Sequence, residues 1–158
     1  MKRVLLTGMS GTGKSSVIDA LTALGYLAVD TDRGWCESTA DGRQRWREDA
    51  IGELLAAEAA EVLFVAGCEE NQVLFHPRFD VIILLSAPAP VLIERLATRT
   101  SNPYGKSPGD LRRVLDDLAA VEPRLRAAAD HEIRTTIPLG EVVSAVLTLS
   151  GVRREPPR

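Results

Sequence analysis

Residues 8–15 read GMSGTGKS and have the types and spacing that hold a phosphate group. Glycines let the backbone curl until its N–H groups point into one concavity, and the positive end of a following helix adds to the attraction for an anion. Lys14 is predicted to reach the β- and γ-phosphates of a nucleotide, and Ser15 to offer its hydroxyl to Mg²⁺. The predicted nucleotide-binding residues are Gly8, Gly11, Thr12, Gly13, Lys14, Ser15 and Ser16. ATP and Mg²⁺ are therefore the expected cofactors.

An acidic pair, Asp30 and Asp32, follows the next apolar run of the sequence. Open α/β sheets bind their ligands at the carboxyl ends of their strands, which is where this pair is expected to lie. Asp32 is predicted to orient the hydroxyl of an acceptor or to take its proton, and Asp30 to hold magnesium or its bound water. The alternative is an Asx turn in which Asp32 caps the segment that follows.

Two arginines, Arg95 and Arg99, stand four residues apart and so share one face of a predicted helix. They precede the segment Thr100–Lys106, which is predicted to form a short lid. Guanidinium groups in this position stabilise the negative charge that spreads over a transferring phosphoryl group. The predicted catalytic residues are Lys14, Asp32, Arg95 and Arg99. For Arg95 the alternative is an ordinary ion pair on a helix surface.

Residues 33–49 hold both tryptophans of the chain and several arginines, among them Arg43 and Arg45. An aromatic face with guanidinium groups suits a planar or anionic acceptor. Arg33 and Trp35 are therefore assigned to acceptor binding, although a tryptophan here can equally be a packing residue. Gly67 is predicted to let the backbone approach the acceptor closely. The predicted acceptor-binding residues are Asp30, Asp32, Arg33, Trp35 and Gly67.

These residues need a scaffold, and the chain alternates short apolar runs with helical patterns. The expected strands are Arg3–Thr7, Tyr26–Val29, Val62–Ala66, Val81–Leu85 and Glu132–Thr135. The expected helices are Lys14–Ala23, Arg45–Ala60, Pro88–Thr98, Pro108–Ala128 and Leu139–Leu149. Continuous apolar strands indicate a sheet that is buried on both faces, and helical crossovers make it parallel. We expect an α/β domain with a doubly wound five-stranded parallel sheet over residues 1–150, and a flexible tail over residues 151–158.

Composition excludes several classes of protein. With 158 residues, 45% of them hydrophobic, the chain can bury one normal core. The net charge of −3 and the scattered arginines make nucleic acid an unexpected partner. Two distant cysteines and the absence of a long apolar run favour a cytoplasmic protein without a membrane anchor. The expected partner is a small-molecule acceptor, and the expected oligomeric state is a monomer or a homodimer.

The order of these motifs resembles the nucleoside monophosphate kinase superfamily, which includes adenylate, shikimate and gluconate kinases. The likeness rests on the phosphate loop, on Gly67-Cys68 after the third expected strand, and on Glu94–Arg99 before the short lid. Within this superfamily, the chain is most similar to atypical adenylate kinases that also hydrolyse ATP. The resemblance implies that Arg95 lies near the adenine or the phosphates and that Arg99 lies on the phosphates. Many adenylate kinases carry an aspartate where this chain has Ala66, so Asp30 or Glu69 is expected to replace it.

The expected function is ATP-dependent phosphoryl transfer to a small acceptor under a short mobile lid. The arginines near Trp46 favour a nucleoside monophosphate, whereas Asp30 and Asp32 favour a hydroxyl metabolite. The alternative is an ATPase or nucleotide-sensing switch that acts on a macromolecular partner.

Overall fold

A five-stranded parallel sheet forms the centre of the molecule, with strand order β2-β5-β1-β6-β7. The computed structural model describes residues 1–100 and 104–153, so part of the predicted lid, residues 101–103, and the end of the predicted tail, residues 154–158, lie outside the described residues. The strands are β1 (Lys2–Thr7), β2 (Leu27–Asp30), β5 (Val62–Ala66), β6 (Val81–Ser86) and β7 (His131–Arg134). Every pair in this sheet is parallel. The predicted doubly wound α/β fold is confirmed.

The described residues also form five α-helices and one 3₁₀ helix, which connect the strands or, for the last of them, follow β7. They are α1 (Lys14–Ala23), α2 (Glu48–Ala56), η1 (Glu70–Arg78), α3 (Ala89–Thr98), α4 (Pro108–Ala128) and α5 (Leu139–Leu149). Local sequence explains their ends: Ser107 caps α4 by accepting a hydrogen bond from the Asp110 N–H at 3.1 Å, and Pro108 takes the first helical position. None of the helices in the described ranges combines the length and apolar character needed to cross a membrane.

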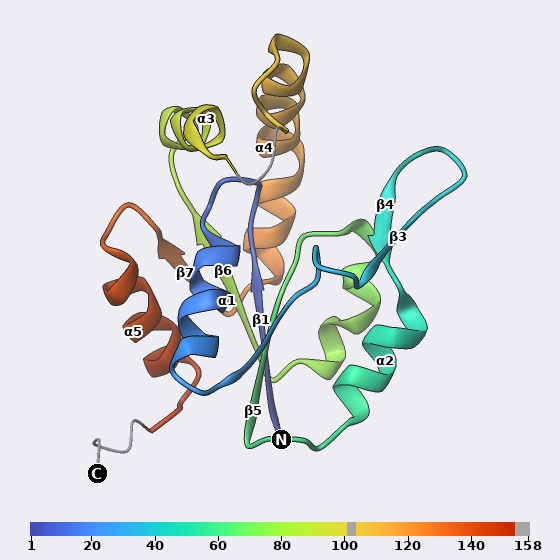
Figure 1. The fold of residues 1–158 in the computed structure, drawn as a ribbon, viewed down its shortest axis with the longest axis vertical. Coiled ribbons are helices and arrows are strands. Elements are labelled where there is room, and N and C mark those ends of the chain that lie inside the picture. The colour runs from blue at the N-terminus through green and yellow to red at the C-terminus, as the bar shows by residue number, and fades with distance from the viewer. Residues whose placement is uncertain (101–103, 154–158) are drawn as a thin grey trace.

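The sheet has helices on both of its faces (Figure 1), and apolar cores lie between the sheet and these helices. One face packs against α1 and α5, where Leu6 and Phe64 meet Val17 and Val146. The other face packs against α2 and η1, where Leu5 and Val65 meet Ile51 and Phe75. Strand β6 is buried along its whole length, as expected for a strand covered on both sides. Because helices cover the central strands β5, β1 and β6 on both faces, ligands are expected at the ends of these strands.

A hairpin replaces the beginning of one predicted helix. Residues Cys36–Ser38 form β3 and Gln44–Trp46 form β4, which pair as antiparallel strands. The predicted helix Arg45–Ala60 is therefore wrong at its start, since α2 begins only at Glu48. The Asp41-Gly42 turn explains the difference, because Gly42 adopts a φ of 81° that a hairpin turn needs. The hairpin stands beside the carboxyl ends of β2 and β5 (Figure 1).

Candidate active site

The phosphate loop (residues 8–15) joins the end of β1 to the start of α1. Gly8 has no room for a side chain, since an added Cβ would meet the Leu85 carbonyl oxygen, and Gly13 adopts a φ of 97°. Thr12 is fully buried and donates a hydrogen bond from its hydroxyl to the Met9 carbonyl at 2.8 Å. The loop forms one wall of a cavity of about 510 Å³. The loop thus joins a strand to a helix, as the sequence predicted.

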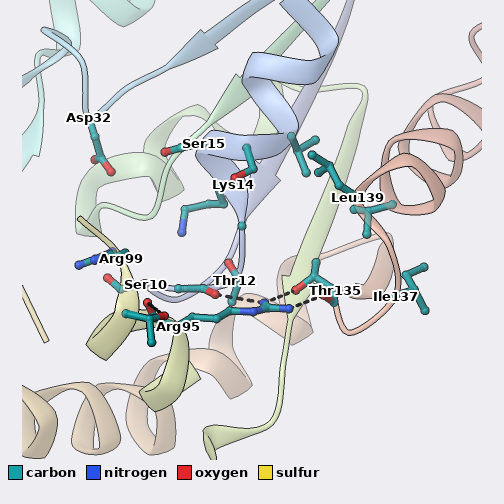
Figure 2. Close-up of a pocket in the computed structure, with 16 residues that line it drawn as sticks. Ser10, Thr12, Lys14, Ser15, Asp32, Arg95, Arg99, Thr135, Ile137 and Leu139 are labelled. Carbon is teal, nitrogen blue, oxygen red and sulfur yellow. Dashed lines mark hydrogen bonds between the residues drawn. The ribbon is translucent and has the colours of Figure 1, made fainter. Parts of the chain in front are cut away.

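Lys14 lines this cavity, and its side chain is drawn in Figure 2. Its ammonium donates hydrogen bonds to the carbonyls of Gly8, at 2.5 Å, and Met9, at 3.1 Å. Burial lowers the pKa of Lys14, while Cys68 and nearby carboxylates, Asp32 first among them, oppose that shift. The lysine is thus held within its own loop, at the place where a bound polyphosphate would offer it a stronger partner.

The two predicted metal ligands, Ser15 and Asp30, contact each other. The Ser15 hydroxyl donates to Asp30 Oδ2 at 2.6 Å. Asp30 is 7% exposed, and its other oxygen accepts a hydrogen bond from the Asp32 N–H at 3.0 Å. A hydroxyl and a carboxylate are oxygen ligands of the kind that Mg²⁺ prefers, so these residues fit the ion. Asp30 of β2 is also the direct register partner of Ala66 of β5, the position at which many adenylate kinases carry an aspartate.

Asp32 lines the same cavity as Lys14. Loss of surrounding water raises the pKa of Asp32, the charge of Asp30 raises it further, and the Lys14 ammonium opposes both. Carboxylate and thiol atoms of Asp32, Cys36 and Glu69 lie within 4.8 Å of one another. Burial, followed by the charge of Asp32, raises the pKa of Glu69 to about 7. Asp32 is thus a carboxylate with acidic neighbours, close to the place where phosphates are expected.

The predicted catalytic arginines point in different directions (Figure 2). Arg95 donates to the Gly11 carbonyl at 3.2 Å, and to the hydroxyl and carbonyl of Thr135 at 3.0 and 2.5 Å. Two exposed aliphatic side chains, Ile137 and Leu139, lie at the same end of the cavity. Arg95 is therefore not an isolated surface residue, and its surroundings suit a nucleotide base better than a transferring phosphoryl group.

Arg99 lies at the opposite end of the cavity from Thr135, where its charge acts on Asp32 (Figure 2). It follows the last residue of α3, and its guanidinium donates to the Tyr104 carbonyl at 2.7 Å. Burial lowers the pKa of Arg99, and Tyr104 and Asp32 oppose this shift. Among the two predicted arginines, Arg99 has the better position for contact with a γ-phosphate.

Two residues predicted to bind the acceptor, Arg33 and Trp35, have surroundings other than those expected. Arg33 forms an ion pair with Asp19 of α1 at 2.6 Å and reaches Asp30 at 3.5 Å, outside the lining of the phosphate-loop cavity. Trp35 lines a separate groove with Arg47 and residues of α2. Both positions depend on contacts with other elements, α1 for Arg33 and α2 for Trp35, which the local sequence pattern did not reveal.

Gly67 has a packing role in addition to its predicted one. An added Cβ would lie 2.9 Å from two ring atoms of Trp46 and would also meet the Thr31 hydroxyl. The Trp46 ring is fully buried and donates its indole N–H to Thr31 Oγ1 at 3.0 Å. Gly67 therefore makes room for this buried tryptophan, and a contact between its backbone and an acceptor stays a prediction.

Sequence reasoning missed several residues of the site. Cys36 approaches Asp32 only because of the unexpected hairpin. Thr135 follows β7 directly, so the rule that ligands gather at the carboxyl ends of strands was the available signal. Ile137 and Leu139 gave the weaker signal of aliphatic residues around a proline.

Comparisons with known proteins agree with this geometry. The AAA domain family model matches residues 4–116. No curated protein matches the chain. The fold is similar to the shikimate kinase from Acinetobacter baumannii, solved in complex with shikimate, at 20% identity and a TM-score of 0.69 over 94% of this chain and 92% of that one. A gluconokinase from Sinorhizobium meliloti 1021 is 25% identical, with a TM-score of 0.67 over 95% of this chain and 91% of that one.

A second shikimate kinase, from Bacteroides thetaiotaomicron, is 20% identical with a TM-score of 0.68, covering 96% of this chain and 99% of that one. The matches span nearly the whole of both chains in each case. The family match includes the phosphate loop, Arg95 in α3 and Arg99 directly after it, so a phosphate-loop domain is supported independently of the site geometry. The chain belongs to the AAA domain family of phosphate-loop proteins, with the fold of the shikimate kinases and gluconokinase.

Proposed function

We propose that the protein transfers the γ-phosphoryl group of ATP to a hydroxyl group of a small acceptor. The observation that carries the proposal is that Asp32 and the phosphate-loop Lys14 line one cavity. A carboxylate within reach of both the acceptor and the γ-phosphate can take the hydroxyl proton, and the position of Asp32 in this cavity supports that role. The gluconokinase likeness, at 25% identity, supports the same class of acceptor.

The reaction forms a bond between the acceptor oxygen and the γ-phosphorus while the bond from that phosphorus to the β–γ bridging oxygen breaks. ADP leaves with the electron pair, and the hydroxyl proton goes to the Asp32 carboxylate. Lys14 and Arg99 stabilise the negative charge on the transferring group. Arg95, held by Gly11 and Thr135, fixes the wall against which the nucleotide base packs.

Magnesium would be held by the Ser15 hydroxyl and, directly or through water, by Asp30. When bound, the ion neutralises charge on the β- and γ-phosphates. Asp30 takes the place of the aspartate missing at Ala66, since the two residues are paired in register and Asp30 already contacts Ser15. Ala66 therefore does not argue against catalysis of transfer.

A nucleoside monophosphate is a less suitable acceptor. Arg43 pairs with Asp41 at 3.4 Å, and Arg45 pairs with Glu37 at 2.9 Å, so both hairpin arginines have carboxylate partners. Trp46 is fully buried and offers no face to a base. The features that favoured a planar anion in the sequence thus contribute to the hairpin and the core.

Incubation of the purified protein with ATP, Mg²⁺ and a panel of sugars, polyols, amino alcohols, hydroxy acids and nucleoside monophosphates tests the proposal. Mass spectrometry should detect a phosphorylated hydroxyl compound, and ADP release should rise with its concentration. Asp32→Asn should retain ATP binding and lower transfer by about 10²-fold or more. Asp116→Asn, at an exposed position on α4, is the control and should leave transfer unchanged.

Two results would contradict the proposal. Equal transfer rates for wild type and Asp32→Asn would remove Asp32 from its role. ATP hydrolysis that no small compound accelerates, but that a protein or RNA partner does accelerate, would establish the rival ATPase switch instead.

A further inference from the structure

Asp30, the carboxylate proposed to hold magnesium, already has a cationic side chain beside it. Arg33 Nε lies 3.5 Å from Asp30 Oδ2, the same oxygen that accepts the Ser15 hydroxyl at 2.6 Å. Asp30 is 7% exposed, and no other aspartate or glutamate among the described residues is buried. A buried carboxylate needs a compensating charge. Arg33 is therefore a counter-ion of Asp30, at the oxygen that faces Ser15.

The turn after β2 places Arg33 close to Asp30. The Arg33 N–H donates to the Asp30 carbonyl at 3.0 Å, and the Asp32 N–H donates to Asp30 Oδ1 at 3.0 Å. These contacts fix the backbone from which the Arg33 side chain starts. The local sequence thus keeps Arg33 near Asp30, and only the direction of its guanidinium group depends on other elements.

Asp19 of α1 sets that direction. Both Nη atoms of Arg33 donate to Asp19, one to each carboxylate oxygen, at 2.6 and 3.3 Å. This paired geometry is the strong form of an arginine–carboxylate contact. The hydrogen bond from Arg33 lowers the pKa of Asp19, so Asp19 stays charged at neutral pH. The end of the guanidinium is thus held by α1, and only Nε is directed toward Asp30.

The ion pair of Arg33 with Asp19 is able to rearrange. The two side chains are 57% and 60% exposed, and exposed ion pairs contribute little to the stability of a fold. Without Asp19, the Nη atoms can turn to the nearby carboxylate of Asp30. A guanidinium bonded to Asp30 would compete with any cation for the same oxygens.

We propose that Asp19 is a positioning residue of the magnesium site, which holds the Arg33 guanidinium away from Asp30 and so leaves Asp30 open to the ion. The inference rests on the proposed function, in which Ser15 and Asp30 hold magnesium, and it adds a pair of residues that controls the affinity for that ion. Arg33 is the competing cation, and Asp19 is its alternative partner.

Binding of the non-hydrolysable ATP analogue β,γ-imido-ATP tests the inference without turnover. Isothermal titration calorimetry gives its dissociation constant in EDTA and in Mg²⁺. The ratio of the first constant to the second, called here the magnesium ratio, measures the coupling between nucleotide and ion. For wild type this ratio should be about 10 or more. Circular dichroism first establishes that each variant is folded.

A double-mutant cycle separates the position of Arg33 from the charge of Asp19. Asp19→Asn should lower the magnesium ratio by about fivefold or more, because the released guanidinium engages Asp30. In the Arg33→Gln background the same change should lower the ratio by less than about twofold, since the competing cation is gone. Asp19→Glu keeps the ion pair and should stay within about twofold of wild type. Asp116→Asn, at an exposed position on α4, is the control for a lost surface charge and should leave the ratio unchanged.

The possible failures of the inference and of the magnesium site are distinct. A magnesium ratio that Asp19→Asn leaves unchanged would overturn the inference. Equal losses in the wild-type and Arg33→Gln backgrounds would also overturn it, because Asp19 would then act through its charge alone. Both results leave the proposed function intact. A wild-type ratio near one would instead remove the magnesium site of the proposed function, and the inference with it.

Discussion

Replacement of Gly67 by alanine tests whether this glycine serves the core or the acceptor. The Gly67 N–H donates to the Leu6 carbonyl at 3.1 Å, which fixes the backbone, so the new methyl group cannot move away easily. It would lie 2.9 Å from Cζ2 and Nε1 of Trp46, well inside the ordinary carbon contact distance of about 3.5–4.0 Å. The ring is fully buried and has no free space to move into.

The expected loss follows from these contacts. Overpacking of a core typically lowers the free energy of unfolding by about 1–3 kcal/mol, and loss of the Trp46 to Thr31 hydrogen bond adds about 1 kcal/mol. Gly67→Ala should therefore lower the free energy of unfolding by roughly 2–4 kcal/mol. The protein should remain folded, since domains of this kind have about 5–15 kcal/mol of stability.

Urea unfolding, followed by tryptophan fluorescence and by circular dichroism, measures this loss. Gly140→Ala is the matched control, because no atom lies within 4 Å of an added Cβ there and the position is helical. That change should raise the free energy of unfolding by up to about 1 kcal/mol. The double variant Gly67→Ala/Trp46→Phe has a smaller ring beside the new methyl group, so it should recover part of the lost free energy of unfolding. A Gly67→Ala variant that is as stable as wild type would refute the packing argument.

Three further predictions concern charge at the site. Lys14→Ala should abolish ATP-dependent transfer while the circular dichroism spectrum stays native, and Ser15→Ala should raise the Mg²⁺ concentration needed for half-maximal rate; unchanged magnesium dependence would remove Ser15 as a ligand. Arg99→Ala should lower kcat by about 10³-fold with little change in the KM for ATP, and Arg95→Ala should mainly raise that KM. If steady-state kinetics show the kcat loss for Arg95→Ala and the KM increase for Arg99→Ala, the two roles are reversed. The pKa of Glu69 is raised to about 7, so the folded state binds this proton more tightly than the unfolded state, and the contribution of Glu69 to the free energy of unfolding should fall as pH rises from about 4.5 through 7. Urea unfolding at pH 5 and pH 8 measures this: between the two pH values the free energy of unfolding should decrease by roughly 1–3 kcal/mol more for wild type than for Glu69→Gln. An equal decrease in the two proteins would contradict the shift.

Local pattern was sufficient for elements whose signals lie within the element itself. The helices Lys14–Ala23, Pro108–Ala128 and Leu139–Leu149 have the predicted bounds, because each has a glycine, serine or proline at its start and a regular apolar face. The buried strands were equally clear, since continuous apolar runs such as that of β6 are typical of a covered parallel sheet.

The errors arose where distant parts of the chain decide the structure. The helix predicted from Arg45 failed because β4 pairs with β3 across the Asp41-Gly42 turn, a signal that was present but given too little weight. The 3₁₀ helix Glu70–Arg78 contains Pro77 and has no regular apolar period, so no pattern indicated it.

Side-chain roles were harder to predict than elements. Ser15 and Asp30, each predicted to hold magnesium, contact each other, because strand ends meet the phosphate loop at one edge of the sheet. The partner of Arg33 is Asp19 on α1, and the space in front of Gly67 is filled by Trp46. Neither contact follows from spacing, since each depends on how separate elements pack.

The contact of Arg95 with Gly11 and Thr135 has a consequence for the order in which the protein becomes functional. The guanidinium connects the phosphate loop to Thr135, which directly follows β7, the strand furthest along the sequence in the described sheet. A nascent chain that has not yet released β7 from the ribosome has a complete phosphate loop but lacks this wall of the cavity. This wall of the cavity can therefore form only after β7 has been synthesised and has joined the sheet, so full affinity for ATP is expected only from that stage of synthesis onward.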